Sequence, residues 1–134
     1  MRLVIFGGRD LDLSIFAIDI WLSLCGHWPA KPGELEVVEG EARGVDVSAR
    51  RWGEHHSLTV HKYFANWQLY RAAAGPIRNA EMVKVADSGV GFISTEGSKG
   101  TANMRDQMIK AKRPLMMIEY NFIEPESVEE YEDF

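Results

Sequence analysis

The sequence LVIFGGRD, residues 3–10, places four apolar residues in a row directly before two glycines. A short apolar run that ends in this way is typical of a β-strand buried on both faces of a parallel sheet. Apolar residues then recur at helical spacing from Leu13 to Leu24, with Asp12 or Ser14 as the expected N-cap. A buried strand followed by such a helix indicates the beginning of a βαβ unit.

The same alternation continues along the chain. Further strands are expected at residues 35–39, 58–60, 90–93 and 115–118, and further helices from residue 45, from residue 75 and at 102–112. Strands that alternate with helices at this spacing form parallel sheets with right-handed crossovers. The sequence therefore predicts an α/β, Rossmann-like three-layer domain with a five-stranded, mainly parallel sheet and helices on both faces.

Composition limits the class of protein. With 134 residues and 46% apolar residues, the chain can build one core, and we expect one domain at 1–122 followed by an acidic tail at 123–134. It contains no apolar stretch long enough to span a membrane and no signal-peptide pattern. Its one cysteine, Cys25, excludes an internal disulfide, so we expect a cytoplasmic protein. Neither a metal site nor a cofactor is indicated.

The net charge of −5 is concentrated at one end of the chain. Residues 124–134 hold six of the 20 acidic residues, so the preceding part has 14 acids against 15 bases and is nearly neutral. An acidic segment repels a polyanion, and no block of lysine or arginine compensates for it. Nucleic acid is therefore not the expected partner.

Ligands of parallel α/β sheets bind beyond the carboxyl ends of the strands, where the strand order reverses. Three glycine-rich loops follow predicted strands there, at 7–10, 40–46 and 95–101. Arg9 and Arg43 lie in two of these loops, and Arg78 is expected in the first turn of the third helix, where a cation opposes the helix dipole. Arginine can bind phosphate in a bidentate manner. The alternative for each is a tight turn or a surface ion pair.

The loop at 97–101 resembles an anion cradle, because a helix begins there with free N–H groups and two hydroxyl side chains. It has neither the Walker A order nor the dinucleotide fingerprint. The four tryptophans are expected to be packing residues more often than ligand-stacking ones, but Trp67, in the loop before the third helix, could cover a ligand base. His55 and His56 are expected to end the second helix.

The candidate ligand-binding residues lie in the four segments described above. They are Gly7, Gly8, Arg9, Asp10, Glu39, Gly40, Ala42, Arg43, Gly44, Asp46, Arg78, Asn79, Gly97, Ser98, Lys99, Gly100 and Thr101. The arginines would neutralise phosphate, and Asp46 or Glu39 could bind ribose hydroxyls.

These segments together resemble the YspA-type branch of the SLOG superfamily. The motifs are GGRD (7–10), GEARGVD (40–46), AGPIRNAEM (74–82) and GSKGTANM (97–104), and their order and spacing match from residue 3 to about residue 119. The resemblance implies a Rossmann-like fold related to the LOG phosphoribohydrolases and to the DNA-processing protein A core. For the YspA-type branch it implies ligand binding, with no settled activity.

The sequence departs from the hydrolytic members of that superfamily at one position. The resemblance places Met104 where LOG phosphoribohydrolases carry the catalytic glutamate of Pro-Gly-Gly-x-Gly-Thr-x-x-Glu. A thioether cannot supply the carboxylate charge that an oxocarbenium-like centre needs. Glu81 or Glu96 could substitute, with Arg78 as a further catalytic candidate, and the sequence leaves open whether the protein is an enzyme.

Three functions are therefore carried forward. The first is a sensor or sequestering domain that binds a nucleotide or a nucleotide-derived phosphate ligand. The second is a nucleotide N-glycosidase, and the third is a nucleic-acid or protein interaction module. A homodimer is also expected, and Met82, Met104 and Met108 could contribute to its interface, although such methionines more often belong to a core. The chain would suit a phage or mobile-element protein as well as a bacterial one.

Overall fold

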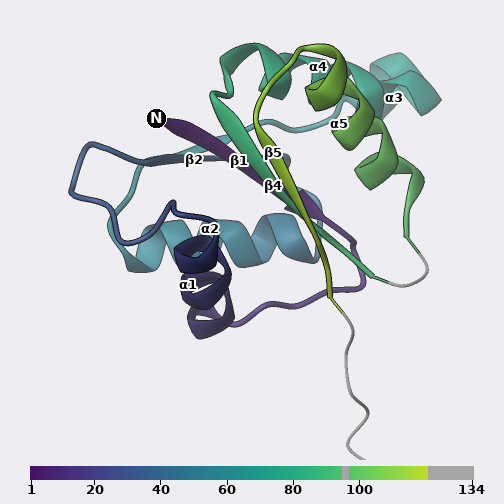
Figure 1. Cartoon of the computed structure of the whole chain (residues 1–134). Helices are drawn as coiled ribbons and strands as arrows, with labels where there is room; N and C mark the ends of the chain where they lie inside the picture. Colours follow the sequence, from purple (N-terminus) through teal and green to yellow (C-terminus); the bar gives the residue numbers. More distant parts are fainter. Residues whose placement is uncertain (95–96, 121–134) are drawn as a thin grey trace, which may run out of the picture.

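A computed structural model of the chain describes residues 1–94 and 97–120 (Figure 1). The elements along the chain are β1 (Arg2–Gly7), α1 (Ile15–Leu24), β2 (Glu36–Glu39), α2 (Val45–His55), β3 (Val60–Lys62), α3 (Trp67–Tyr70), the 3-10 helix η1 (Arg71–Ala73), α4 (Ala74–Val85), β4 (Ser88–Ile93), α5 (Lys99–Lys110) and β5 (Leu115–Glu119). The acidic segment and Glu96, both singled out from the sequence, lie outside the described residues.

The five strands form one sheet in the order β3-β2-β1-β4-β5. Every neighbouring pair is parallel, with Val4 of β1 opposite Val38 of β2 on one side and opposite Gly89 of β4 on the other. The predicted Rossmann-like α/β fold is thus confirmed, with a sheet that is entirely parallel. The strand order reverses between β1 and β4, which is where such sheets place their ligands.

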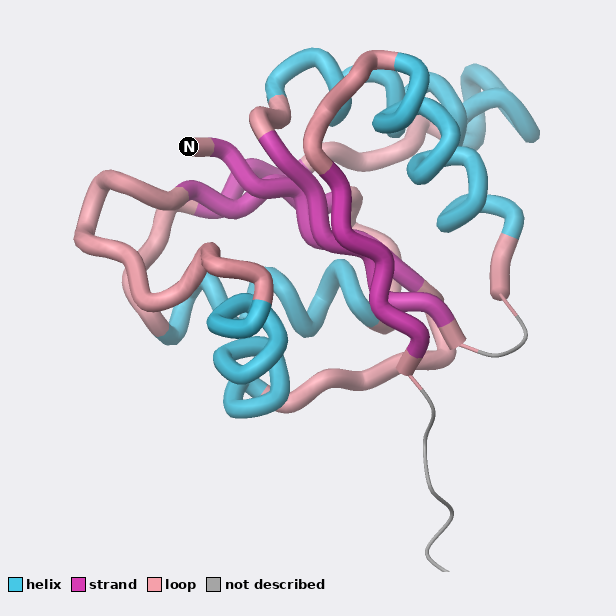
Figure 2. Tube along the Cα trace, in the orientation of Figure 1, coloured by secondary structure: helices cyan, strands magenta, loops and turns pink. Residues whose placement is uncertain are grey.

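Helices cover both faces of this sheet (Figures 1 and 2). On one face, α1 and α2 pack Ile18, Leu22 and Trp52 against β1 and its neighbours, and on the other, α4 and α5 contribute Met82 and Met108. Consecutive residues of β1 point to opposite faces, and the four from Leu3 to Phe6 are all buried, which explains the unbroken apolar run in the sequence. The result is the predicted three-layer architecture.

Three helix boundaries follow from the residues that cap them, of which Ser14 was the expected one. Ser14 is the N-cap of α1, and its hydroxyl accepts the N–H of Ala17 at 3.0 Å. Ser98 caps α5 in the same manner, accepting the N–H of Thr101 at 3.1 Å. Gly44 begins α2 at φ +83°, and a side chain there would collide with the backbone of Gly8 and Arg9.

Several expected boundaries were wrong, and the strand expected at 90–93 begins at Ser88. The third strand is not residues 58–60 but Val60–Lys62, because the segment after α2 first closes a turn in which the N–H of Leu58 bonds to Gly53. The third helix begins at Ala74 and continues directly from η1, so Arg78 lies in its second turn and not in its first. The helix expected at 102–112 is α5, which begins at Lys99 and ends at Lys110. It starts three residues earlier than expected because Ser98 caps it.

Two further expectations concern single side chains. Trp67 is not in a loop but begins the short helix α3, whose N-cap Asn66 accepts the N–H of Leu69. Met82, Met104 and Met108 are all buried within this one chain and therefore offer no exposed face to a second copy. None of the helices in the described part of the chain is long and apolar enough to cross a membrane.

Candidate functional site

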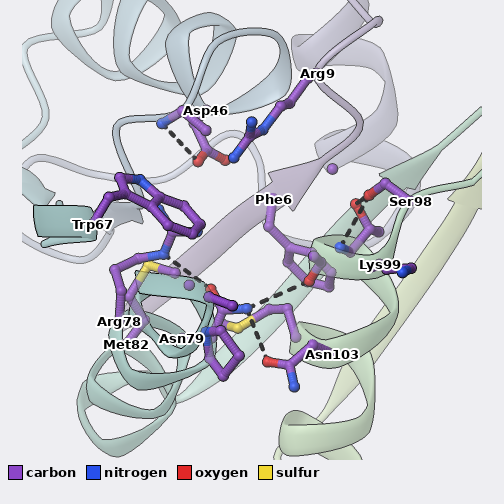
Figure 3. A pocket seen from close by; sticks show the side chains of 18 residues that line it. Phe6, Arg9, Asp46, Trp67, Arg78, Asn79, Met82, Ser98, Lys99 and Asn103 are labelled. Atoms are coloured by element: carbon purple, nitrogen blue, oxygen red, sulfur yellow. Dashed lines mark hydrogen bonds between the residues drawn. The ribbon is translucent and has the colours of Figure 1, made fainter. Parts of the chain in front are cut away.

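A pocket of about 570 Å³ opens at the carboxyl ends of β1 and β4, at the reversal of strand order. Its volume falls within the range of about 300–1,000 Å³ that small-molecule sites occupy. Figure 3 shows side chains entering it from three sides: Arg9 and Asp46 from one, Trp67 and Arg78 from another, and Ser98 and Lys99 from the third. We call this the main pocket.

Most of the candidate ligand-binding residues line the main pocket. They are Gly7, Arg9, Ala42, Asp46, Arg78, Asn79, Ser98, Lys99, Gly100 and Thr101. The other candidates do not line it: Gly8, Asp10, Glu39, Gly40, Arg43, Gly44 and Gly97. The segments that were distant in sequence thus converge, although a part of each loop faces elsewhere.

Arg78 is held in place by its neighbours in the pocket wall. Its Nη1 donates to the carbonyl of Gly40 at 2.6 Å, and its Nε donates to Oδ1 of Asn79 at 3.1 Å. Asn79 is itself buried, and its amide donates to Oδ1 of Asn103 at 3.1 Å, so α4 and α5 are joined beneath the pocket. A guanidinium fixed in this way is preorganised for an anion, because little side-chain freedom is lost on binding.

Gly40 allows this arrangement by lacking a side chain. A Cβ at this position would lie 3.0 Å from Nη1 of Arg78 and 3.0 Å from Oδ2 of Asp46. Both distances are shorter than ordinary van der Waals contact, so a larger residue would displace the two charged groups. The glycine after β2 is therefore needed for the packing of the site and need not contact a ligand.

Asp46 presents a carboxyl group to the main pocket while remaining only 7% exposed. Its Oδ2 accepts the N–H of Ala42 at 3.2 Å. Burial raises the pKa of Asp46 to about 6, against the opposing influence of the Ala42 N–H and of the charges on Arg78 and Arg9. Asp46 can therefore exchange a proton near neutral pH, as a group at a functional site often does.

Glu39 lies at the end of β2, fully buried at 0% exposure. Its Oε2 accepts the N–H of Glu41 at 2.6 Å, while its Oε1 has no hydrogen-bond partner among the residues that the structure describes. Burial, with a smaller contribution from the charge of Asp46, raises the pKa of Glu39 to about 7 against the opposing influence of the Glu41 N–H. Because Glu39 does not line the main pocket, its expected contact with ribose hydroxyls is not available from this position.

The N-terminus of α5 forms the third side of the main pocket. The hydroxyl of Ser98 donates to Oγ1 of Thr101 at 2.7 Å and caps the first turn. Lys99 and Gly100 follow in that turn, and both line the pocket. The positive end of the helix dipole and the lysine charge both favour an anion here.

Trp67 closes the pocket on the side of α3 and is 48% exposed. The indole packs over Gly75, where a Cβ would lie 3.3 Å from the ring. The indole lines the pocket, and the face of an aromatic ring can stack on a planar group. Trp67 therefore lines the pocket from the start of α3, and its contact with a ligand base stays a prediction.

The catalytic candidates are placed differently. Pocket-lining residues of α4 follow the helical spacing of Gly75, Arg78, Asn79 and Met82, and Glu81 lies off this row with an exposed side chain. Glu81 therefore does not reach the main pocket. Glu96 falls outside the described residues. Met104 does line the pocket and is buried, so an apolar group occupies the position that the resemblance assigned to a glutamate.

Sequence analysis missed part of the lining. The lining residues absent from the predicted binding set are Phe6, Trp67, Ala72, Gly75, Pro76, Met82, Asn103 and Met104. Phe6, Met82 and Met104 belong to the apolar core beneath the pocket, and no sequence pattern distinguishes such floor residues from other core residues. Asn103 on α5 accepts a hydrogen bond from the amide of Asn79 on α4. A pairing between two helices depends on the fold and has no local signal in the sequence.

A smaller depression of about 280 Å³ lies beside the main pocket. Four of the predicted binding residues line it: Arg9, Asp10, Arg43 and Gly44. We call this depression the second hollow. It is lined by Arg9, Asp10, Leu11, Asp12, Arg43, Gly44, Val47 and Arg51. Arg9 lines both depressions, so they are neighbours.

Comparison with known proteins gives one relationship. The chain is 33% identical over 103 residues to the Gene 61 protein of Mycobacterium phage D29, a match that covers 72% of this chain and 82% of that protein. The chain belongs to the family of this phage protein. No protein-family model and no solved structure matches it. A relative of the Gene 61 type agrees with the expectation of a phage or mobile-element protein.

Proposed function

We propose that the main pocket binds a nucleotide or a nucleotide-derived phosphate ligand. The observation that supports this most directly is the convergence of Arg9, Arg78 and Lys99 with the N-terminus of α5 on one concave site. Four positively charged features around one cavity favour an anion of more than one negative charge. The resemblance to the SLOG superfamily, carried by three loops and the first part of α4, points to the same class of ligand.

The chemistry of the remaining lining fits the other parts of a nucleotide. The indole of Trp67 offers a surface on which a base can stack, and the apolar floor of Phe6 and Met82 lies beneath it. Asp46 offers acceptor oxygens for sugar hydroxyls. In this arrangement the phosphate meets Lys99 and the start of α5, while the sugar lies towards Asp46.

Binding is tested by titrating the full chain with nucleoside 5′-monophosphates and following tryptophan fluorescence and the melting temperature. A ligand that binds the native state adds about 2.7 kcal/mol to the free energy of unfolding at a hundredfold excess over its Kd. The melting temperature rises accordingly. Arg78→Ala should weaken binding at least tenfold, since it removes a charge-assisted contact. Arg105→Ala on the far part of α5 is the matched control and should bind normally.

Two results would contradict the proposal. One is the absence of a shift with every nucleotide tested. The other is an equal loss of affinity in Arg78→Ala and Arg105→Ala, because the effect would then be one of overall charge and not of the pocket.

A second candidate function is hydrolysis of the N-glycosidic bond, and Asp46 is the observation that favours it. Among the described residues it is the one carboxylic acid that lines the main pocket, and its pKa of about 6 suits an acid–base role. The assay is the appearance of free base and ribose phosphate during incubation. Release that is abolished in Asp46→Asn and unchanged in Glu81→Gln supports the enzyme, whereas recovery of intact nucleotide supports binding alone.

A further inference from the structure

We propose that the second hollow is a phosphate subsite, so that the ligand of this protein is a nucleotide extended by at least one further phosphate group. This inference rests on the proposed function, because it assigns the first phosphate to the main pocket. The observation behind it concerns Arg43, which the sequence predicts to bind phosphate. This residue lies outside the main pocket and lines the second hollow.

The second hollow gathers three guanidinium groups from three segments. Arg9 comes from the loop after β1, Arg43 from the loop before α2, and Arg51 from the second turn of that helix. All three arginines are exposed, so their mutual repulsion is largely screened by water, and a phosphate that reaches them gains a charge-assisted contact from each. Arg43 has no ion-pair partner among residues 1–94 and 97–120.

The backbone beside these arginines also favours an anion. Gly44 is the N-cap of α2 and has no side chain to accept the first N–H groups of that helix. Both Gly44 and Val47 line the second hollow, so the positive end of the helix dipole adds to the field of the arginines. A side chain at Gly44 would collide with Arg9, which indicates that the two loops are packed as closely as the backbone permits.

Two carboxylates oppose this field. Asp10 and Asp12 line the same hollow, and Oδ1 of Asp12 lies 3.8 Å from Nη1 of Arg51. At that distance between exposed side chains the pair is weak, and a doubly charged phosphate competes for the arginine. The two acids leave the hollow with a smaller net positive charge, since Asp10 and Asp12 stand against Arg9, Arg43 and Arg51.

Arg9 determines how the two depressions act together. Because it lines both of them, a phosphate chain that leaves the main pocket passes this side chain before it reaches Arg43. Figure 3 shows Arg9 directed towards Asp46, at the boundary of the main pocket. A ligand with one phosphate would contact Arg9 alone, whereas an extended one would also contact the second hollow.

The test compares AMP with ATP, and GMP with GTP, by isothermal titration of the full chain with EDTA present. We expect the triphosphate to bind at least about tenfold more tightly than the monophosphate, the gain expected of charge-assisted contacts. The double variant Arg43→Ala/Arg51→Ala should lose most of this advantage and keep the affinity for the monophosphate. Asp12→Asn should strengthen triphosphate binding alone, because it frees Arg51.

The double variant Arg2→Ala/Lys31→Ala is the matched control, since it removes the same charge at the amino end of the sheet and should retain the advantage. Equal affinities for monophosphate and triphosphate would overturn the inference and leave the proposed function standing. A parallel loss for both ligands in Arg43→Ala/Arg51→Ala, or the same loss in the control, would also overturn it. Failure of every nucleotide to bind would refute the proposed function itself.

Discussion

Replacing Asp46 by asparagine should change how the stability of the protein depends on pH. The carboxyl group is nearly buried, and burial raises its pKa from 3.8 to about 6. Between these values the native state keeps a proton that the unfolded chain has lost, so the free energy of unfolding falls as the pH rises from about 4 to about 6. The raised pKa is thus a source of instability at neutral pH.

The magnitude follows from the shift. About two pKa units correspond to about 3 kcal/mol, an upper limit because Glu39 titrates beside Asp46 and the two acids share the effect. Asparagine does not ionise, and its side-chain oxygen can still accept the N–H of Ala42. The stability of Asp46→Asn relative to the natural protein should therefore increase by about 1–3 kcal/mol between pH 4.5 and pH 7.5.

Urea unfolding at a series of pH values, followed by tryptophan fluorescence, measures this difference. Glu81→Gln removes a carboxylate from the exposed side of α4 and controls for the loss of one negative charge. A difference between Asp46→Asn and the natural protein that stays constant across the pH range would refute the reasoning, because the carboxyl group would then titrate alike in the native and unfolded states.

Three further outcomes concern stability and can be measured by denaturant unfolding. Gly40→Ala should cost about 1–3 kcal/mol, since its Cβ would lie 3.0 Å from both Arg78 and Asp46; an unchanged midpoint would show that these side chains relax freely. Ser98→Ala should cost about 1 kcal/mol through loss of the α5 N-cap, whereas Ser98→Asp should retain most of that stability. Trp52→Ala should cost about 3–5 kcal/mol, because the indole is fully buried; a loss below about 1 kcal/mol would mean that the core collapses around the gap.

The fold could be predicted from the sequence because its signals are local. The run before Gly7 is apolar at every position, and a strand with both faces buried needs that composition. The third strand was misplaced because it lies at the edge of the sheet and is marked by polar side chains: Nε2 of His61 lies 2.6 Å from Oε1 of Glu36 on the neighbouring strand. An edge strand held by such a pair carries little apolar periodicity.

The site was predictable only in part. Glycine and arginine at the ends of strands mark loops that a parallel sheet brings together, so Arg9 and Arg78 were expected near one another. Arg78 was expected in the first turn of its helix, where a cation opposes the helix dipole. This was wrong, because α4 begins at Ala74 and Arg78 lies in the second turn. Its position is set by the carbonyl of Gly40 and by Asn79, contacts between distant segments that no local pattern reveals.

The buried carboxyl of Asp46 also explains how the main pocket tolerates its own cations. Burial lowers the pKa of Arg78, the positive charge of Arg9 lowers it further, and Asp46 counteracts both. The carboxylate of Asp46 thus partly offsets the two positive charges that face the same cavity. A countercharge with a pKa of about 6 can gain or lose its charge within a small change of pH near neutrality, which a carboxylate with an ordinary pKa would not do.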